Sequence, residues 1–537
     1  MYRQMFGSEN AANDELLEEC YVPPPSLVLQ RPILVGKWGT GKTGLLIHRN
    51  APLAKALRTV TKHDRIWYLD ETGIQVQTLK EIERVAGQDI HATKRLLESI
   101  WKSEIVRAAA SVLHELRNYY GMQDKEHWKK LSTIFDLLDK KSVWELVPSA
   151  LAVFAPERGA ATSDFLDKIR AASDDSLFEL VQTCLNDIIH NEVQPVVAIE
   201  PIETPTSHIE NESDLAQLLV TCLLNVFYKY FQPSERQLIK VEISIPWHRY
   251  ARGEVGEPQK LFPFIGRFRW TKTSLREFIN KRIEWEYRRV KRHFIAKGTH
   301  DAWSSLFPDT IKSAVGFTEG SWDYVIRHSQ YRVRDVLRLT REAVEHEAVS
   351  KKLSPDELLT ARGSRVSIKS IRAAVSKASR QTAYERIIEG DRRFPGLQEA
   401  CEALRGISVP FASAEFKRRL ERRTPENERV DFRKTLSDLW NAGIIGIQLV
   451  AHNLAAVGQL KASFETGPLA RTSNEGKEAI FYVFEHFTEK GIAEIVATYD
   501  GDQIRAEPAD IALKLVVHPM LFEALDIRVS ESHPIGI

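Results

Sequence analysis

One stretch of the sequence combines residue types and a spacing that suit the binding of a phosphate chain. Residues 36–43 read GKWGTGKT and match the pattern G-x-x-x-x-G-K-[ST]. The stretch follows a short apolar run, Ile33–Val35, and precedes a segment of helical character that begins at Gly44. Glycines at these places let the backbone turn tightly, so that several N–H groups point inward beside the positive end of a helix. The motif therefore predicts a loop that holds the phosphates of a nucleotide.

The polar side chains of this loop have distinct expected roles. Lys42 would reach the β- and γ-phosphates of ATP, and the Thr43 hydroxyl would be a ligand of Mg²⁺. The residues predicted to bind the nucleotide are Gly36, Gly39, Thr40, Gly41, Lys42 and Thr43. We therefore expect ATP and Mg²⁺ as the cofactors.

Hydrolysis of ATP needs carboxylates as well, one that holds Mg²⁺ and one that polarises the attacking water. Two acidic pairs follow apolar runs: Asp70 with Glu71, and Glu200 with Glu203. Only one helix fits between the phosphate loop and Asp70. The strand before Asp70 is therefore better explained as the strand next to the first helix than as the strand that binds Mg²⁺. We favour Glu200 and Glu203 and keep Asp70 and Glu71 as the alternative.

The elements that must position these residues follow from the hydrophobic pattern. Apolar runs of strand type are Ile33–Val35, Arg65–Asp70, Val193–Ile199 and Leu238–Ile245. Residues 89–190 have apolar side chains at helical spacing. Strands separated by helices predict a parallel sheet with helices on its faces.

The second half of the chain has a different pattern. Residues 275–375 are predicted to be helical, with turns near the glycines. Two or three short helices are expected after them, within Leu397–Leu404, Ala414–Arg423 and Phe432–Asn441. Two strands follow, at Ile444–Val450 and Ala479–His486.

Composition excludes several classes of protein. The 537 residues include 74 Lys and Arg and 73 Asp and Glu, a net charge of +1, which excludes a globally basic nucleic-acid coat. Hydrophobic residues are 43% and charged residues 27%, as in folded globular proteins. The four cysteines lie far apart without a CxxC pair, which argues against a disulfide framework or a zinc ribbon and predicts a cytoplasmic location.

Membrane insertion is not expected. The N-terminus is acidic and has no apolar core, so we do not expect a signal peptide. The most apolar stretch, Leu215–Phe231, is interrupted by polar residues and is too short to span a bilayer. It predicts a buried helix.

The order of these segments resembles a bacterial P-loop ATPase family of the AAA+/STAND type, close to the KAP and origin-recognition-like ATPases. The segments that carry the resemblance are GKWGTGKT, VVAIEPIE, IKVEISIPWHRY, GRFRWTKTSLREFINKRI, RHSQYRVRDVLRL, LWNAGIIGI with AIFYVFEHF, and VVHPMLFEAL. The resemblance implies an α/β P-loop NTPase fold, a parallel sheet with a large helical insertion, a helical lid and a C-terminal winged-helix domain. The expected parts are a polar tail at 1–30, an ATPase core at 31–295 with an insertion at about 90–190, a lid at 296–375, and a winged-helix-like domain at 376–537.

The resemblance also assigns roles to residues. Glu200 takes the Mg²⁺-binding place and Glu203 the water-activating place, while His248 or Arg249 takes the place of a γ-phosphate sensor. Arg334 takes the place of the lid arginine that contacts phosphate. Two positions depart from the family pattern: a glutamate replaces the usual aspartate at 200, and a valine replaces the proline before Arg334. We therefore expect nucleotide binding with slow hydrolysis.

A basic segment needs its own explanation. Residues 267–297 contain eleven Lys and Arg against three acids, with aromatic residues interleaved. The segment could bind nucleic acid, it could supply Arg267 or Arg269 as an arginine finger to a neighbouring subunit, or its arginines could pair with acids elsewhere. All three interpretations stay open.

Three functions remain as hypotheses. The first is a nucleotide-switched ATPase that forms homo-oligomers or engages an effector protein, with the regulatory and anti-phage roles that the resemblance implies. The second is a DNA-tethered, origin-recognition-like ATPase that uses the winged helix and the basic segment. The third is a nucleotide-bound scaffold with negligible turnover.

Overall fold

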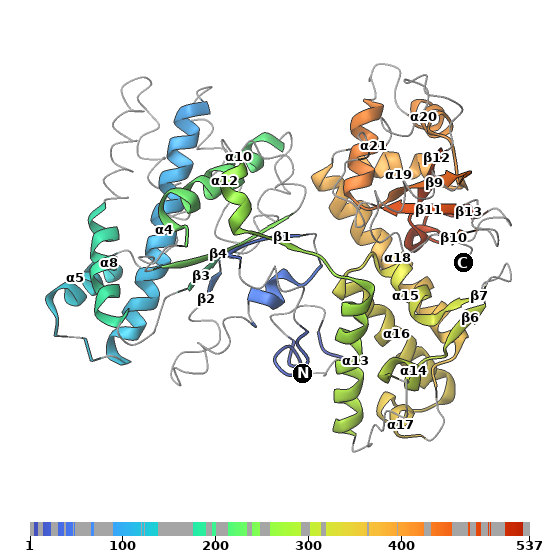
Figure 1. Ribbon diagram of the computed structural model, residues 1–537, viewed down its shortest axis with the longest axis horizontal. Helices are drawn as coiled ribbons and strands as arrows, with labels where there is room; N and C mark the ends of the chain where they lie inside the picture. Colours follow the sequence, from blue (N-terminus) through green and yellow to red (C-terminus); the bar gives the residue numbers. More distant parts are fainter. Residues whose placement is uncertain are drawn as a thin grey trace. The chain divides into compact units, whose positions relative to one another are not determined.

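The computed structural model forms two compact units, each described by itself below (Figure 1). The N-terminal unit contains Leu17–Arg269 together with Ala11–Asn13, and the C-terminal unit contains Trp270–Ile537 together with Met1–Asn10 and Asp14–Leu16. The structure describes residues 5–8, 14–22, 31–36, 39–46, 48, 66–68, 90–119, 121–122, 124–137, 175–189, 196–199, 213–233, 239–246, 258–290, 301–312, 318–361, 365–394, 396–423, 431–453, 471–472, 479–484, 492, 495 and 511–529.

A five-stranded parallel sheet forms the centre of the N-terminal unit. Its strands lie in the order β2 (Ile66–Tyr68), β3 (Val196–Ile199), β4 (Lys240–Pro246), β1 (Ile33–Gly36) and β5 (Ile265–Phe268). Every neighbouring pair is parallel. The predicted parallel sheet is confirmed, and so are four of its strands. The strand β5 was not predicted, because it overlaps the start of the basic segment and contains an arginine.

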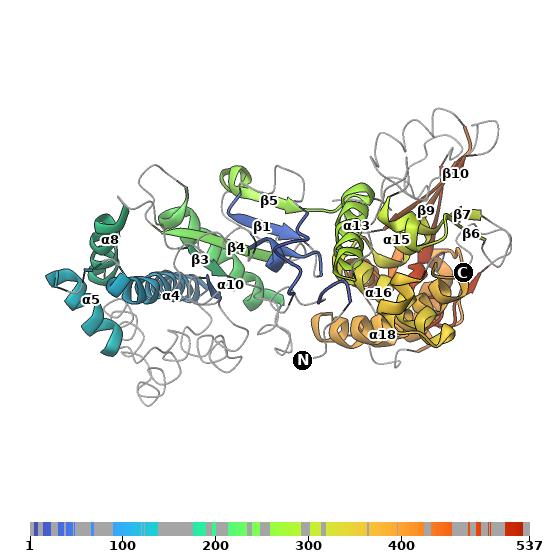
Figure 2. The same cartoon turned by 90° about the horizontal axis from the view of Figure 1, so that it is seen from below.

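Helices cover the sheet of the N-terminal unit. The predicted helical stretch contains α4 (Ile90–Tyr119), α5 (Glu126–Leu137) and α8 (Asp175–Ile189). The predicted buried helix is α10 (Ser213–Val226), which continues as a π-helical turn, η2 (Phe227–Phe231). The helices α4 and α10 pack together on one face of the sheet (Figure 2).

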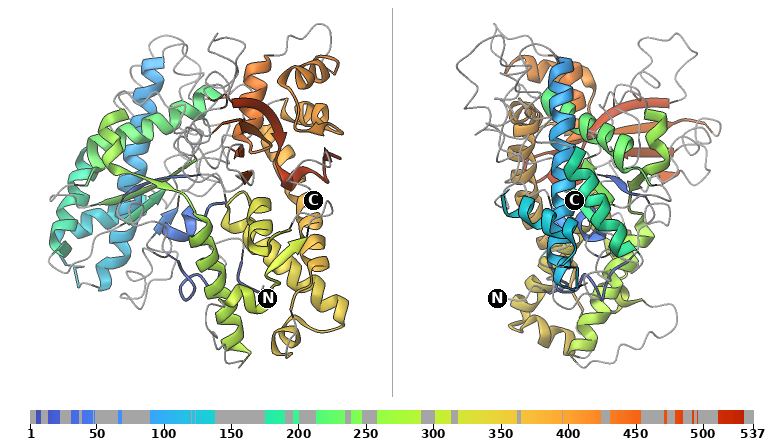
Figure 3. Two further views of the ribbon diagram at one scale, coloured as in Figure 1. Left: turned by 45° about the vertical axis from the view of Figure 1, so that its right-hand side comes forward. Right: turned by 90° about the vertical axis from the view of Figure 1, so that its left-hand side faces the viewer.

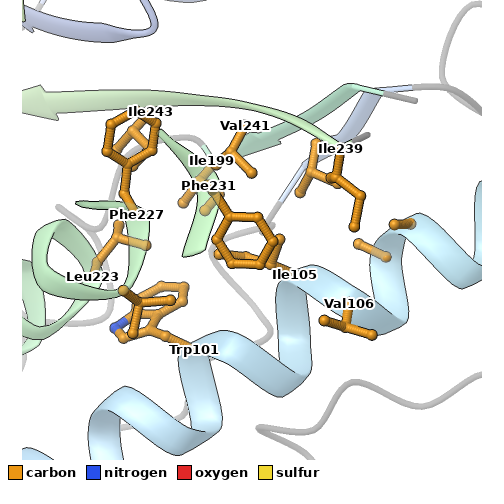
Figure 4. Close-up of a cluster of buried hydrophobic side chains, with 14 of the residues drawn as sticks. Trp101, Ile105, Val106, Ile199, Leu223, Phe227, Phe231, Ile239, Val241 and Ile243 are labelled. Atoms are coloured by element: carbon orange, nitrogen blue, oxygen red, sulfur yellow. The ribbon is translucent and has the colours of Figure 1, made fainter. Parts of the chain in front are cut away.

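The core of this unit lies between α4, α10 and the strands. Trp101 of α4 packs beside Leu223 and Phe227 of the α10–η2 segment, below strand residues such as Val241 (Figure 4). The indole Nε1 of Trp101 donates a hydrogen bond of 3.1 Å to the carbonyl oxygen of Leu219, so the buried ring has no unsatisfied N–H. In the part of the chain that the structure describes, no helix is long and apolar enough to cross a membrane.

Helices also dominate the first half of the C-terminal unit. They are α13 (Lys272–Arg289), α14 (Ala302–Leu306), α15 (Ser321–Ser329), α16 (Val333–Lys351), α17 (Pro355–Thr360) and α18 (Ile368–Arg393). Capping boxes at Thr271 and Ser354 begin α13 and α17. A small hairpin of β6 (Thr310–Lys312) and β7 (Thr318–Gly320), which was not predicted, interrupts the helices.

The second half of the C-terminal unit combines short helices with an antiparallel sheet. The helices are α19 (Leu397–Leu404), α20 (Ser413–Glu421) and α21 (Phe432–Asn441), as predicted. The sheet has the order β10 (Arg471–Thr472), β11 (Ala479–Phe484), β9 (Ile445–Ala451) and β12 (Ile511–Val517), drawn in orange and red in Figure 3. The predicted strands β9 and β11 are confirmed, whereas β12 was not predicted. Helix α18 runs without a break through residue 375, where the predicted lid ends.

The prediction of a polar tail for residues 1–30 is wrong for the part that the structure describes. The buried apolar residues of this segment are Phe6, Leu16, Leu17, Cys20 and Val22, each at most 5% exposed. Residues 5–8 and 14–16 pack in the C-terminal unit, and residues 17–22 belong to the N-terminal unit. The acidic residues of this segment predicted a solvated tail. The sequence alone does not show that Asp14 pairs with a side chain 268 residues further along the chain.

Candidate phosphate-binding site

The predicted phosphate loop lies at the carboxyl end of an interior strand. Strand β1 ends at Gly36 and pairs with β4 on one side and β5 on the other. Residues 42–46 are helical, and the amide of Leu45 donates a 3.1 Å hydrogen bond to the carbonyl oxygen of Gly41. The loop thus joins a buried strand to a helix at the edge of a parallel sheet where ligands of such sheets bind.

Three glycines of the loop occupy positions that need glycine. Gly39 and Gly41 have φ values of 75° and 92°, in the left-handed region that other residues adopt at a cost. At Gly36 the restriction is steric, because a Cβ there would lie 2.8 Å from Phe268 Cβ and 3.0 Å from its carbonyl oxygen. The cause is the register of the sheet, which sets Gly36 beside Phe268 on β5.

The lysine of the loop folds back across it. The side chain of Lys42 donates a 3.0 Å hydrogen bond from Nζ to the carbonyl oxygen of Gly36, and only 6% of the residue is exposed. Thr40 is equally buried, and Thr43 is half-buried at the second helical position. A buried ammonium is stabilised by an anion in its neighbourhood, so this arrangement fits a phosphate group.

The predicted carboxylates and the predicted sensor lie outside the described residues. This applies to Glu200, Glu203, Asp70 and Glu71, and to the pair His248 and Arg249. The strands that precede the acidic pairs are described. Neighbouring strands lie roughly 4.8 Å apart, so β3 is about 10 Å and β2 about 14 Å from β1 in the sheet order.

The predicted lid arginine belongs to the other unit. Arg334 is the second residue of α16 and is half-buried. The next residue, Asp335, is buried, and burial raises the pKa of its carboxyl to about 6 although the charges of Arg332 and Arg338 lower it. A role for Arg334 at the phosphates of a nucleotide rests on the resemblance.

The start of α16 is fixed by an unusual backbone turn. Gln330 and Tyr331, between α15 and α16, have φ values of 50° and 57°, in the left-handed region. The Gln330 side chain donates a 2.7 Å hydrogen bond from Nε2 to the carbonyl oxygen of Gly443. This bond ties the turn to the part of the unit that holds α21 and β9.

Acids neutralise most of the predicted basic segment in the described part of the chain. The ion pairs are Lys272–Asp323, Arg276–Asp301, Lys281–Glu277, Arg282–Asp14, Arg288–Glu284, and Arg289 with both Glu286 and Asp356. The aromatic residues Trp270 and Tyr287 are buried, at 7% and 2% exposure, so their faces are not available to stack on bases. The structure therefore favours the interpretation in which the arginines pair with acids elsewhere. Arg267 and Arg269 are exposed.

Sequence reasoning missed two contacts next to the loop. Phe268 forms the wall against which Gly36 packs, and no motif marks it. The ring of Tyr21 stacks on the helical residue His48, shortly after the loop, with ring centroids 3.6 Å apart. Both contacts join segments that are distant in sequence.

The cysteines and acids of the described residues form no other site. All four cysteines are buried and free. Among the described residues, no group of three or more His, Cys, Asp or Glu side chains could hold a metal ion.

Comparisons with known proteins give only weak likenesses. No family model matches the chain, and no curated protein matches it. Two solved structures from Aeropyrum pernix are similar to the chain at low identity. One is the ORC1 protein in complex with DNA, at 13% identity and a TM-score of 0.30, covering 91% of this chain and 90% of that chain. The other is the ORC2 protein in ADPNP–ADP complexes, at 10% identity and a TM-score of 0.26, covering 88% and 86%.

The class of the fold follows from the chain itself. A parallel sheet is covered by helices, and its interior strand β1 runs directly into a glycine loop closed by Lys42 and followed by a helix. The chain has an α/β P-loop NTPase fold.

Proposed function

We propose that the chain binds ATP with Mg²⁺ at residues 36–43 and works as a slowly hydrolysing, nucleotide-dependent switch of the AAA+ type. The observation that carries this proposal is the closed loop. Its glycines have the required backbone, and Lys42 lies inside it with Nζ 3.0 Å from the Gly36 carbonyl oxygen.

The loop residues divide the work of holding the nucleotide. Backbone amides between Gly39 and Thr43 and the Lys42 ammonium would bind the phosphates, and the Thr43 hydroxyl would be a ligand of Mg²⁺. When bound, Mg²⁺ neutralises charge that develops on the phosphates. A loop that is already closed needs little ordering upon binding, which favours tight binding.

The order of the sheet supports Glu200 and Glu203 as the hydrolytic carboxylates. Both follow β3, whereas Asp70 and Glu71 follow β2, the strand one place further from the loop. A residue after β3 therefore starts nearer to the loop. Glu200 would hold Mg²⁺ and Glu203 would orient water, and the longer side chain at 200 supports slow turnover. Arg249 and Arg334 would contact the γ-phosphate, as the resemblance implies.

The partner that we propose is a protein or a second copy of this chain. The paired charges of α13 argue against a nucleic-acid surface there. The order of α19, α20 and α21 followed by the strands β9 and β11 supports a winged-helix domain. Its helix α20 carries basic residues that pair with Glu415 and Glu421 on the same helix, which suits a protein contact better than DNA. An anti-phage role rests on the resemblance alone.

The test is binding of MgATP to the Lys42→Ala variant. In the unaltered chain, MgATP should raise the melting temperature, because a ligand that binds only the folded state stabilises it. The variant should lose both the shift and the bound nucleotide. Lys130→Ala, which removes an exposed lysine of α5 paired with Glu126, is the matched control and should behave like the unaltered chain. Nucleotide that still binds to Lys42→Ala would refute the site.

A further inference from the structure

The segment of residues 14–22 links the two units of the chain. Its first part, Asp14–Leu16, belongs to the C-terminal unit, and the chain enters the N-terminal unit at Leu17. The main chain returns to the C-terminal unit only between Arg269 and Trp270. The chain therefore passes between the units near its N-terminus as well as between Arg269 and Trp270. We call residues 14–22 the strap.

One end of the strap is held by a buried ion pair. Arg282 of α13 donates from Nη2 to Asp14 Oδ2 at 2.5 Å and from Nη1 to Asp14 Oδ1 at 3.2 Å. The two side chains are 1% and 3% exposed. A bidentate pair of this kind has a fixed geometry as well as charge. The Asp14 carboxylate also accepts from the amides of Ser8 and Leu16, so it organises the chain around it.

Residues before the strap strengthen this attachment to α13. The amide of Phe6 donates to Glu286 Oε1 at 3.0 Å, and the carbonyl oxygen of Phe6 accepts from Arg282 Nη1 at 2.5 Å. Gly7 has a φ of 85°, and a Cβ there would lie 2.2 Å from Arg282 Nη1. The side chains of α13 thus form a fitted seat for the N-terminal residues, which buries Phe6 completely.

The other end of the strap reaches the helix that follows the phosphate loop. Tyr21 stacks on His48 with ring centroids 3.6 Å apart and planes 12° from parallel. Cys20 and Val22 on either side of it are 1% exposed. His48 lies five positions after Thr43 of the loop.

The strap is short between its two attachments. Asp14 and Tyr21 are seven residues apart, so even a fully extended chain spans at most about 25 Å between them. The second connection also begins beside the loop, since Phe268, two residues before Trp270, packs against Gly36. Both connections therefore start from elements that touch the phosphate loop.

We propose that the strap is a mechanical link from the helix after the phosphate loop, through the Tyr21–His48 stack, to the Asp14–Arg282 pair on α13. Its first role is to restrict movement of the C-terminal unit. Its second role is to transmit the nucleotide state to that unit. The second part of this inference rests on the proposed function, because it needs ATP at the loop. The first part does not depend on nucleotide binding, because a second tether restricts movement of the unit whether or not nucleotide is bound.

The experiment measures the distance distribution between the units with fluorescent labels. The four native cysteines are buried, so cysteines introduced at Lys129 on α5 and at Val349 on α16, which is 78% exposed, can be labelled selectively. Arg282→Met should broaden the distribution in the absence of nucleotide. Tyr21→Leu keeps the α13 seat, and it should retain MgATP binding but lose the change in distance that MgATP produces in the unaltered chain.

Arg276→Met is the matched control. It removes another arginine of α13, whose partner Asp301 is not part of the strap, and should leave the distribution unchanged. Arg282→Lys is a second, milder variant in case Arg282→Met does not fold, and it should give a smaller broadening. A distribution for folded Arg282 variants that matches the unaltered chain would overturn the strap. Absence of MgATP binding in the unaltered chain would refute the proposed function instead, and the nucleotide-free comparison would still test the strap.

Discussion

Lys42 Nζ and the Gly36 carbonyl oxygen are 3.0 Å apart, so the last lysine of the phosphate loop is bonded to the first glycine of the same loop. This bond holds the ammonium inside the loop before any ligand arrives. A group that is already positioned loses little conformational freedom upon binding, and more of the interaction with phosphate then appears as affinity. The same closure makes the loop sensitive to any change that moves Gly36.

Gly36→Ala should weaken both the fold and nucleotide binding. The added methyl group would meet Phe268, with its Cβ at 2.8 Å, and a fault of this kind in a packed interior costs about 1–3 kcal/mol. The end of β1 must then shift, and the loop with it. Thermal melting and MgATP titration would measure the two effects. Gly121→Ala is the control, because its Cβ would meet nothing within 4 Å and adds only the strain of a φ of 62°. Equal MgATP affinity in both variants would contradict the steric argument.

Glu203→Gln should leave MgATP binding intact and slow hydrolysis by roughly 10²–10⁴-fold, the usual contribution of a positioned acid or base. The amide keeps the shape of the side chain but cannot polarise water as a carboxylate does. Single-turnover measurement of phosphate release would separate this step from binding. Glu71→Gln is the matched comparison, since Glu71 follows the more distant strand β2. A loss of hydrolysis in Glu71→Gln alone would move the catalytic carboxylate to the alternative pair.

The strands of the parallel sheet were predictable where the sequence shows an uninterrupted apolar run. Strands β1 and β3 are buried along their whole length, and this burial demands such runs. Strand β5 carries the exposed Arg267 between buried neighbours, so its four residues read as part of a basic helix. The glycine pattern of the loop was predictable because φ values of 75° and 92° select glycine.

Contacts between distant segments were not predictable from the sequence. Nothing in the local sequence relates Asp14 to Arg282 or Tyr21 to His48, and both pairs depend on the folded path of the chain. The basic segment shows the same limit. Its charge looked like a surface for phosphates, but four of the acids that neutralise it come from outside the segment, at 14, 301, 323 and 356.

Asp187→Asn should destabilise the N-terminal unit at neutral pH but not in strong acid. Partial burial would raise the pKa of Asp187, but hydrogen bonds from His127, Lys125 and Trp128 outweigh it and lower the pKa to about 2. The carboxylate joins α8 to the start of α5. Because the pKa is lower in the folded chain than in the unfolded chain, the stabilisation is present above about pH 4 and is lost as the pH falls towards 2.

Unfolding by urea at several pH values measures this difference. We expect the free energy of unfolding of the variant to be lower by about 1 kcal/mol at pH 7. The reduction is modest because a fifth of the Asp187 side chain is exposed to water, which screens its ion pairs. The difference in free energy of unfolding between the variant and the unaltered chain should become smaller between pH 4 and pH 2. Glu126→Gln changes an exposed acid of the same helix start and should leave stability nearly unchanged. A gap that stays constant down to pH 2 would show that the ion pairs of Asp187 do not cause it.

Arg276→Ala and Arg289→Ala should reduce stability without changing any affinity for DNA. Each arginine is held by a carboxylate, Arg276 by Asp301 and Arg289 by Glu286 and Asp356, so neither has its charge free for a phosphate. Anisotropy of labelled DNA at a series of salt concentrations measures this. A residue that contacts phosphate lowers the salt slope by about one unit when it is removed, whereas these variants should keep the slope of the unaltered chain. Arg267→Ala and Arg269→Ala change exposed arginines beside the loop strand and are the comparison variants. If either arginine acts as a finger in a neighbouring subunit, its removal should reduce ATP hydrolysis only in the assembled form. A lower slope in Arg276→Ala would restore the basic segment as a DNA surface and shift the proposed partner from protein to nucleic acid.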